Sequence, residues 1–128
     1  MVVPRLLITD DDMALRRAIA DVFAGRGFDV ALAGDGDEAI ALIQTGQIHL
    51  VVVDLHMPRV SGLEVIRHAR RYDERMPCIL MSAALTDTVE REAEAMHAYR
   101  IFSKPVRVST LRDSVMQGLQ EVYGWKVG

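Results

Sequence analysis

The sequence predicts an α/β protein, a doubly wound sheet of five parallel strands with five helices on its two faces. Short apolar runs alternate with longer segments of helical period, and this alternation repeats five times along the chain. The run from Leu50 to Val53 is uniformly apolar, which is typical of a central strand covered on both faces. Parallel neighbours need a crossover between them, and a helix after each strand supplies it.

The predicted strands are residues 6–8, 28–33, 50–53, 78–81 and 101–102. Asp29 in the second of these places that strand near an edge of the sheet. In the segments that follow the strands, apolar residues recur three and four positions apart, as on the buried face of a helix. These faces consist of Leu15, Ala18, Ile19, Val22 and Phe23; Ala39, Ile40 and Ile43; Leu63, Ile66 and Ala69; Val89, Ala93 and Met96; and Val108, Leu111, Val115, Leu119 and Val122.

Acidic residues stand where two of the predicted helices begin. Asp11 or Asp12 can cap the first helix, because a short side-chain oxygen accepts hydrogen bonds from the free N–H groups of the first turn. Asp87 and Glu90 can cap the fourth helix in the same way.

Length and composition favour one soluble domain, residues 1–128, with a tail from about residue 124. No apolar run approaches the roughly 18 residues of a membrane span. The formal net charge of −3 gives no support for nucleic-acid binding, which uses basic surfaces. The single cysteine, Cys78, suits a reducing compartment, and we therefore expect a cytoplasmic protein.

Charged and hydroxyl-bearing residues stand where the predicted strands end. Asp10 and Asp11 follow the first strand, Asp54 the third, Ser82 the fourth and Lys104 the fifth. Ligands of doubly wound sheets bind beyond the carboxyl ends of the strands. We therefore expect three carboxylates, a hydroxyl and an ammonium to meet at one rim of the sheet.

These groups suit phosphoryl transfer supported by a divalent metal. Crowded carboxylates repel one another, and a hard cation such as Mg²⁺ relieves the repulsion through oxygen ligands. A carboxylate such as that of Asp54 can attack phosphorus and form an aspartyl-phosphate. Lys104 and the metal can supply positive charge to the phosphoryl oxygens, and the Ser82 hydroxyl can donate a hydrogen bond to one of them.

Taken singly, the same residues have structural interpretations. An aspartate at a strand end often caps the next helix, as Asp11 can. Ser82 alone would be a turn residue and Lys104 alone a surface lysine. Cys78, inside an apolar strand, is better explained by packing than as a nucleophile. It is the combination, with each residue in its own strand, that favours a functional site.

The sequence resembles the receiver domain of two-component response regulators along nearly its whole length. The resemblance rests on five segments in order: Leu7-Ile8-Thr9-Asp10-Asp11-Asp12, Val53-Asp54-Leu55-His56-Met57-Pro58, Ser61-Gly62-Leu63, Met81-Ser82-Ala83 and Ser103-Lys104-Pro105. Each segment alone is weak evidence for the resemblance, whereas all five in this order are specific for the family. The resemblance implies the flavodoxin-like receiver fold with strand order 2-1-3-4-5.

The resemblance also implies a role for each residue of the rim. Asp54 would be the phosphoacceptor and would bind Mg²⁺ (or Mn²⁺) together with Asp11 and the backbone carbonyl of His56, while Asp10 would orient metal-bound water. Lys104 would pair first with the carboxylate and then with the phosphoryl group. Ser82 would follow a phosphoryl oxygen and move the loop after the fourth strand. Such a protein is a phosphoacceptor with self-catalysed phosphorylation and dephosphorylation at most, and not otherwise an enzyme.

Two positions depart from the family pattern. The family commonly has Tyr or Phe three residues before the lysine, where this chain has Ile101. Isoleucine is stiff at χ1 and carries no ring, so the switch pair of Ser82 and residue 101 would respond through a different packing change. A Gly-Ala pair often precedes the fifth strand, and here His97-Ala98 occupies that place. His56, two residues after the phosphoacceptor, is interpreted as a rim histidine, although it could accept a proton near neutral pH.

Two other classes of function remain alternatives. An interaction-only receiver would keep the fold without using phosphorylation, and Ile101 is the feature that motivates it. An aspartate-nucleophile phosphatase would also use Asp54, but such enzymes usually carry a second acidic residue where His56 stands. Nucleotide-binding folds are disfavoured, because the first strand–helix turn is rich in aspartate and lacks a glycine-rich motif.

The resemblance further implies partners. A sensor histidine kinase or a phosphotransfer protein would supply the phosphoryl group, and either a downstream protein partner or an effector domain missing from this chain would receive the signal. We expect no nucleic acid and no membrane among the partners of this domain, and a homodimer through the fifth strand and the fifth helix is possible by analogy.

Overall fold

The computed structural model describes residues 2–126, and within them five strands alternate with five helices. In chain order the elements are β1 (Arg5–Thr9), α1 (Met13–Ala24), β2 (Asp29–Ala33), α2 (Gly36–Thr45), β3 (Leu50–Asp54), α3 (Gly62–Tyr72), β4 (Cys78–Ser82), α4 (Asp87–Ala95), β5 (Arg100–Ser103) and α5 (Val108–Tyr123). This order confirms the predicted α/β fold class, with strand boundaries that differ from the predicted ones by at most one residue at either end.

The five strands form one sheet in the order β2-β1-β3-β4-β5, and every neighbouring pair is parallel. The strand order implied by the resemblance is therefore confirmed. β3 lies in the centre and all five of its residues are buried, whereas β2 lies at an edge and exposes Asp29. The register pairs Thr9 with Val53, so that the residues following β1 and β3 emerge side by side.

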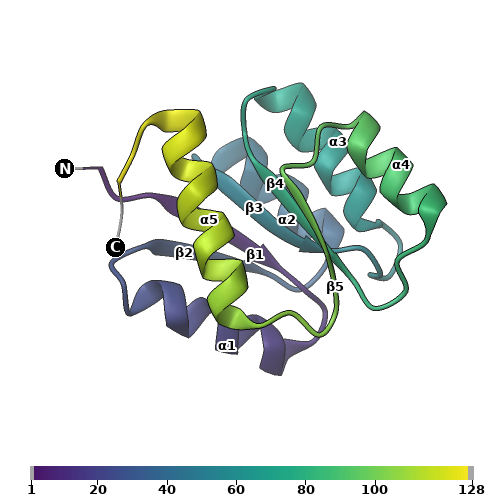
Figure 1. The fold of residues 1–128 in the computed structure, drawn as a ribbon, viewed down its shortest axis with the longest axis horizontal. Coiled ribbons are helices and arrows are strands. Elements are labelled where there is room, and N and C mark those ends of the chain that lie inside the picture. Colours follow the sequence, from purple (N-terminus) through teal and green to yellow (C-terminus); the bar gives the residue numbers. More distant parts are fainter. Residues whose placement is uncertain (1, 127–128) are drawn as a thin grey trace.

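Helices cover both faces of the sheet and enclose two hydrophobic cores. α1 and α5 lie on one face, and α2, α3 and α4 lie on the other (Figure 1). Alternate strand residues point to opposite cores, because successive side chains of a strand face opposite ways: Leu7 packs toward α2 and α3, and Ile8 toward α1 and α5. The two cores hold the five strands in register and leave the loops after the strands to form one rim.

The helix starts follow the expected capping chemistry with one correction. Asp12 caps α1, since its Oδ1 accepts hydrogen bonds from the backbone N–H groups of Ala14 and Leu15. The prediction that Asp87 and Glu90 cap α4 is wrong, because Thr86 is the N-cap and its Oγ1 accepts from Val89 N. Asp87 is instead the first residue of the helix, where a carboxylate still interacts favourably with the helix dipole.

One helix face also differs from its prediction. Ala18 is exposed, although it was expected on the buried side of α1. The buried stripe of that helix is narrower and consists of Ile19, Ala20 and Phe23.

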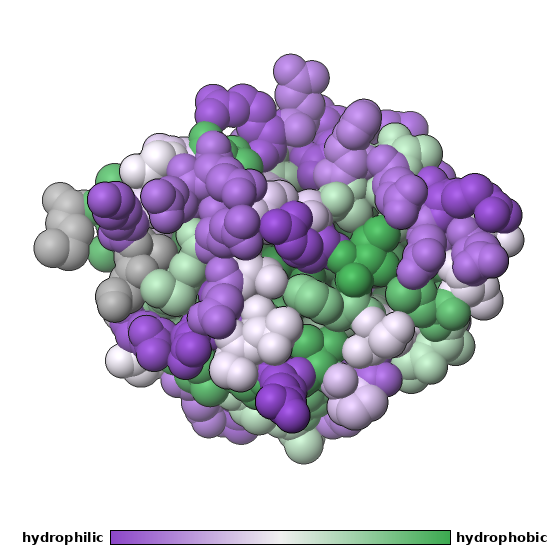
Figure 2. Space-filling model, viewed as in Figure 1, coloured by the Kyte–Doolittle hydropathy of each residue, from purple (hydrophilic) through white to green (hydrophobic). Residues whose placement is uncertain are grey.

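The surface seen in Figure 2 is hydrophilic at its margins, and hydrophobic residues gather over the middle of the same face, near β5 as placed in Figure 1. Ile101 and Phe102 of this edge strand are half-buried. Among residues 2–126, no helix has both the length and the apolar composition needed to cross a membrane.

Candidate functional site

Three aspartates meet at the carboxyl ends of β1 and β3. Asp10 and Asp11 follow β1, and Asp54 is the last residue of the neighbouring strand β3, so that the parallel register brings them together. One carboxylate oxygen of each lies within 4.8 Å of those of the other two. Asp10 is completely buried, Asp54 is 5% exposed and Asp11 is exposed, which opens the cluster to solvent on one side.

Lys104 joins this cluster from the end of β5. Its Nζ lies 2.8 Å from Oδ2 of Asp10 and 3.3 Å from Oδ2 of Asp54. The backbone of the same residue is fixed by a hydrogen bond from Lys104 N to the carbonyl of Ser82, at 2.8 Å. A single ammonium therefore bridges two buried carboxylates, which offsets part of the cost of burying them.

The electrostatics of the site favour a proton or a cation near Asp54. Burial raises the pKa of the Asp54 carboxyl above its ordinary value, and the charge of Asp10 raises it further, while Lys104 acts in the opposite direction. Burial also opposes the charge on Lys104, but the hydrogen bond and negative charge of Asp10, together with Asp54, outweigh it and raise the pKa of Lys104. The carboxylates are thus only partly neutralised by protein groups.

Ser82 lies at the end of β4, next to this site. It is fully buried, and its Oγ accepts a hydrogen bond from Ala84 N at 3.0 Å. This bond uses the hydroxyl as an acceptor, and the hydroxyl proton remains available for donation. Strand pairing places Ser82 beside Ser103, directly before Lys104.

The loop after Asp54 is held close to β3 by a glycine. A Cβ on Gly62 would lie 2.4 Å from the carbonyl oxygen of Asp54, so that no larger residue fits there without movement. Gly62 N donates to Leu55 O at 2.9 Å, and Leu55 N donates to Met81 O at 2.8 Å. The backbone directly after the central aspartate is therefore fixed by hydrogen bonds and by close packing against Gly62.

Arg16 and Asp12 also shape the site, although the sequence did not single out Arg16. The Arg16 guanidinium donates to the backbone carbonyl of Asp10 at 2.6 Å, and Asp12 N donates to Oδ1 of Asp10 at 2.9 Å. A Cβ on Gly34 would lie 3.0 Å from the Arg16 guanidinium, so the loop after β2 gives this side chain its space. The only feature of the sequence that indicates this contact is the position of Arg16, one helical turn after the three aspartates 10–12.

The remaining predicted residues lie around the rim or beneath it. His56 is exposed in the loop after Asp54. Ile101 is half-buried and packs against the core on the side of α3 and α4, away from the side of α1 and α5 where Phe102 packs. His97 stands where the family commonly has glycine and adopts a left-handed conformation, φ 59°, a region that glycine enters without steric cost.

The donor set fits a hard divalent cation. All the candidate ligands at the three aspartates are oxygen atoms, they converge within 4.8 Å, and an exposed carboxylate leaves room for water ligands. Mg²⁺ prefers this chemistry, since it takes one or two carboxylates and retains several waters. Fold and site together define a doubly wound α/β protein with an acidic, lysine-containing pocket at its strand ends.

Comparison with known proteins gives the family. Residues 6–116 match the sequence model of the response regulator receiver domain, and the chain belongs to that family. It is 36% identical over 94 residues to the response regulator MprA of Mycolicibacterium vanbaalenii and 37% identical over 86 residues to the DNA-binding response regulator MtrA of Mycobacterium tuberculosis. These alignments cover 73% and 67% of this chain but 40% and 37% of the relatives, so the chain spans about two fifths of their length.

Solved structures agree with this fold. A CheY-like receiver domain protein from Methanospirillum hungatei superposes with a TM-score of 0.92 at 23% identity, covering 96% of this chain and 98% of that one. The receiver domain of the Francisella response regulator 1452 gives a TM-score of 0.84 at 27% identity, covering 92% and 98%.

Family membership fixes the general function. The chain is a receiver domain of the two-component response regulators, a family whose standard role is to accept a phosphoryl group and whose members bind Mg²⁺ at an acidic pocket. The interaction-only alternative is not favoured by this match.

Proposed function

We propose that Asp54 is the phosphoacceptor of this receiver and that Lys104, Ser82 and the neighbouring aspartates serve its phosphorylation. The observation that carries the proposal is the bridge made by Lys104, whose Nζ contacts Asp10 at 2.8 Å and Asp54 at 3.3 Å beside the exposed Asp11. Asp54 is the strand residue at the centre of this arrangement; Val53 before it is paired with Leu80 of β4, and Leu55 after it makes two backbone hydrogen bonds.

The proposed metal site consists of Asp10, Asp11, Asp54 and the backbone carbonyl of His56. Asp11 and Asp54 would bind Mg²⁺ or Mn²⁺ directly, and Asp10 would orient its water ligands. When bound, the ion supplies positive charge that stabilises the phosphoryl oxygens during transfer. The partial neutralisation of the carboxylates by Lys104 alone supports this assignment.

In the proposed reaction an Asp54 oxygen attacks phosphorus, and the bond between phosphorus and the donor's leaving atom breaks. The leaving group departs with the electron pair of that bond, and the product is an aspartyl-phosphate. Lys104 transfers its contact from the free carboxylate to a phosphoryl oxygen. Such a contact stabilises the product because the phosphoryl group carries more negative charge than the carboxylate that it replaces.

Ser82 would report the phosphoryl group to the rest of the domain. Its hydroxyl can donate a hydrogen bond to a phosphoryl oxygen. Because its Oγ accepts a hydrogen bond from Ala84 N, a displacement of Ser82 would move the loop after β4. Ile101 is the second residue of this switch. Because it is β-branched and half-buried, we propose that it responds by a shift in packing against α4 and not by a swing of its side chain.

The wider setting of the domain follows from the family. Response regulators interact with histidine kinases or phosphotransfer proteins, and we propose that one of these phosphorylates this chain in the cytoplasm. The output would pass to a protein partner or to an effector domain, as in the longer relatives. Residues 1–128 would form a single receiver domain, and the hydrophobic middle of the face near β5 would suit a homodimer (Figure 2).

Intact-mass measurement tests the chemistry. The wild-type chain incubated with acetyl phosphate and Mg²⁺ should gain the mass of one phosphoryl group, and EDTA should prevent the gain. Asp54→Ala should remain unmodified, whereas Asp37→Ala, which removes an exposed aspartate of α2, should be modified like the wild type. An Asp54→Ala chain that still gains a phosphoryl group would refute the assignment.

A further inference from the structure

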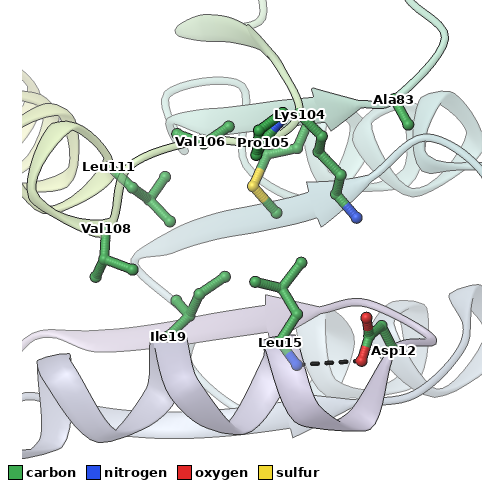
Figure 3. A pocket seen from close by; sticks show the side chains of 10 residues that line it. Asp12, Leu15, Ile19, Ala83, Lys104, Pro105, Val106, Val108 and Leu111 are labelled. Atoms are coloured by element: carbon green, nitrogen blue, oxygen red, sulfur yellow. Dashed lines mark hydrogen bonds between the residues drawn. The ribbon is translucent and has the colours of Figure 1, made fainter.

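A pocket of about 320 Å³ opens beside the acidic site, on the side of α1 and α5. Its walls come from α1, from the end of β4, and from the loop between β5 and α5 with the first turns of α5 (Figure 3). The apolar side chains that line it are those of Leu15, Ile19, Met81, Val106, Val108 and Leu111. Figure 3 shows the side chains of α1 facing those of the loop and of α5 across the pocket.

The pocket is continuous with the phosphoacceptor site. Lys104, Ala83 and Asp12 belong to its lining as well, and the Lys104 ammonium contacts Asp54 at 3.3 Å. Its deeper lining, formed by Ile19, Met81 and Leu111, is apolar and otherwise buried. An occupant therefore meets the charged groups of Lys104 and Asp12 at one end of the pocket and hydrocarbon at the other.

We propose that this pocket binds the acyl group of small acyl phosphates while their phosphoryl group is transferred to Asp54, so that donors with a longer apolar chain are preferred over acetyl phosphate. The inference rests on the proposed function, because it names the class of small-molecule donor that the same site prefers. The distribution of polarity supports it: an acyl phosphate joins a charged group to a hydrocarbon chain, and the pocket joins a charged rim, where Lys104 lies beside Asp54, to a hydrocarbon wall.

The reaction balances with the acyl group as the leaving group. An Asp54 oxygen forms a bond to phosphorus, the bond between phosphorus and the acyl oxygen breaks, and the acyl group leaves as a carboxylate with that electron pair. A carboxylate with a short alkyl chain would keep its charged end near Lys104 and the chain against Leu15 and Val106. A strongly polar leaving group would lose hydrogen bonds to water in this pocket, because its deeper side chains offer none in return.

The preference can be measured by comparing acetyl phosphate with butyryl phosphate. Both release a carboxylate of similar basicity, and their rates of hydrolysis without protein provide the correction for intrinsic reactivity. Wild-type chain with Mg²⁺ is sampled by intact mass at subsaturating donor. Burial of one methylene changes binding by about fourfold, so the two extra methylenes should make butyryl phosphate roughly fifteenfold faster.

Variants that fill the pocket test whether the preference for butyryl phosphate arises there. Val106→Phe and Val108→Phe enlarge half-buried side chains of the lining, and each should reduce the ratio of butyryl to acetyl rates toward one. Leu32→Phe enlarges an exposed side chain on β2, away from the pocket, and should keep the wild-type ratio. Far-UV circular dichroism and urea unfolding show that each variant is folded.

The outcomes separate this inference from the proposed function. Equal corrected rates for the two donors in the wild type, or an unchanged ratio in both filled variants, would overturn the pocket assignment while leaving Asp54 as the acceptor. If neither donor phosphorylates the wild type, or if Asp54→Asn is still phosphorylated, the proposed function itself fails and the inference fails with it.

Discussion

The Lys104 ammonium lies 2.8 Å from Oδ2 of Asp10, a fully buried residue 94 positions earlier in the chain. The exposed fraction of the Lys104 side chain is 17%, so this contact is formed largely out of water. Breaking one partner of such a pair leaves an uncompensated buried charge, which costs more than the intact pair contributes. The same lysine thus supports the folded state and the proposed transfer.

Replacing Lys104 should therefore weaken both stability and phosphorylation. Lys104→Met keeps the length of the side chain but removes its charge, and we expect the free energy of unfolding in EDTA to fall by about 2 kcal/mol. The rate of phosphorylation by acetyl phosphate should fall with it. Urea unfolding and intact mass measure the two effects. Lys104→Arg keeps the charge and is the control; an equal loss in both variants would show that charge is not the cause.

Asp54 should make the folded state less stable at neutral pH than at acid pH. Its pKa is raised in the fold by burial and by Asp10, so between the ordinary aspartate value of about 4 and the raised value the folded chain binds more protons than the unfolded chain. Stability contributed by this group is therefore lost as the pH rises through that window. Without metal, Asp54→Asn should be more stable than wild type at pH 7, and the difference should shrink toward pH 4.

Urea unfolding of the two chains in EDTA at both pH values checks this expectation. A variant that is less stable than wild type at pH 7 would mean that the contact of Asp54 with Lys104 outweighs the burial of its charge. Comparison of wild type with Asp54→Asn removes the contribution of carboxylates distant from Asp54, because their effects are the same in both chains.

Mg²⁺ should stabilise the folded chain through the acidic cluster. A ligand that binds only the folded state contributes about 1.4 kcal/mol at ten times its dissociation constant. The exposed Asp11 is the residue whose loss should abolish this gain with the smallest change in the core. Thermal unfolding of Asp11→Asn with and without MgCl₂ measures it. Asp21→Asn removes an exposed carboxylate of α1 outside the cluster and should respond to Mg²⁺ like the wild type.

Gly62 should be required by the backbone of the site. A Cβ at this position would lie 2.4 Å from the Asp54 carbonyl oxygen, so Gly62→Ala must displace the loop or the strand end. We expect a loss of more than about 2 kcal/mol in the free energy of unfolding, within the range of overpacked sites. Gly25→Ala is the control, because its Cβ would meet the nearest atom at 3.3 Å and its φ of −65° suits alanine. Similar losses for the two variants would contradict the steric argument.

The sequence predicted those parts of the molecule that depend on one chain segment at a time. Apolar runs and helical periods located the strands and helices, and the parallel topology brought Asp10, Asp54 and Lys104 to one rim. The cap of α4 was misplaced by one residue, because Thr86 and Asp87 are both good capping types and the pattern does not distinguish them.

The features that the sequence did not predict depend on where individual side chains lie in the folded chain. Arg16 of α1 donates to the backbone carbonyl of Asp10, and a charged residue near the start of a helix does not by itself predict such a contact. The pocket exists because the lining side chains of α1 and of the first turns of α5 do not fill the space between the two helices. Periodicity assigns such residues to a buried face but does not say how completely two faces interdigitate.

A further such feature is the contact of His49 with the two ends of the chain, and it should make stability depend on pH. His49 Nδ1 accepts a hydrogen bond from Arg5 N at 2.9 Å, the Tyr123 hydroxyl donates to the His49 carbonyl at 2.7 Å, and the Trp125 ring lies 4.8 Å from the imidazole. Protonation of Nδ1 would remove the acceptor that Arg5 N uses. Burial accordingly lowers the pKa of His49.

The sign of the effect follows from that shift. As the pH falls below about 6.5, the ordinary histidine value, the unfolded chain binds a proton that the folded chain still resists, so stability decreases toward pH 5. His49→Gln removes this titration, and its free energy of unfolding should change less than that of wild type between pH 7 and pH 5, as measured by urea unfolding. His68→Gln on α3 leaves His49 in place and should keep the wild-type dependence. Parallel pH profiles for wild type and His49→Gln would show that the imidazole binds protons equally in the folded and unfolded states, which is incompatible with a hydrogen bond from Arg5 N to Nδ1.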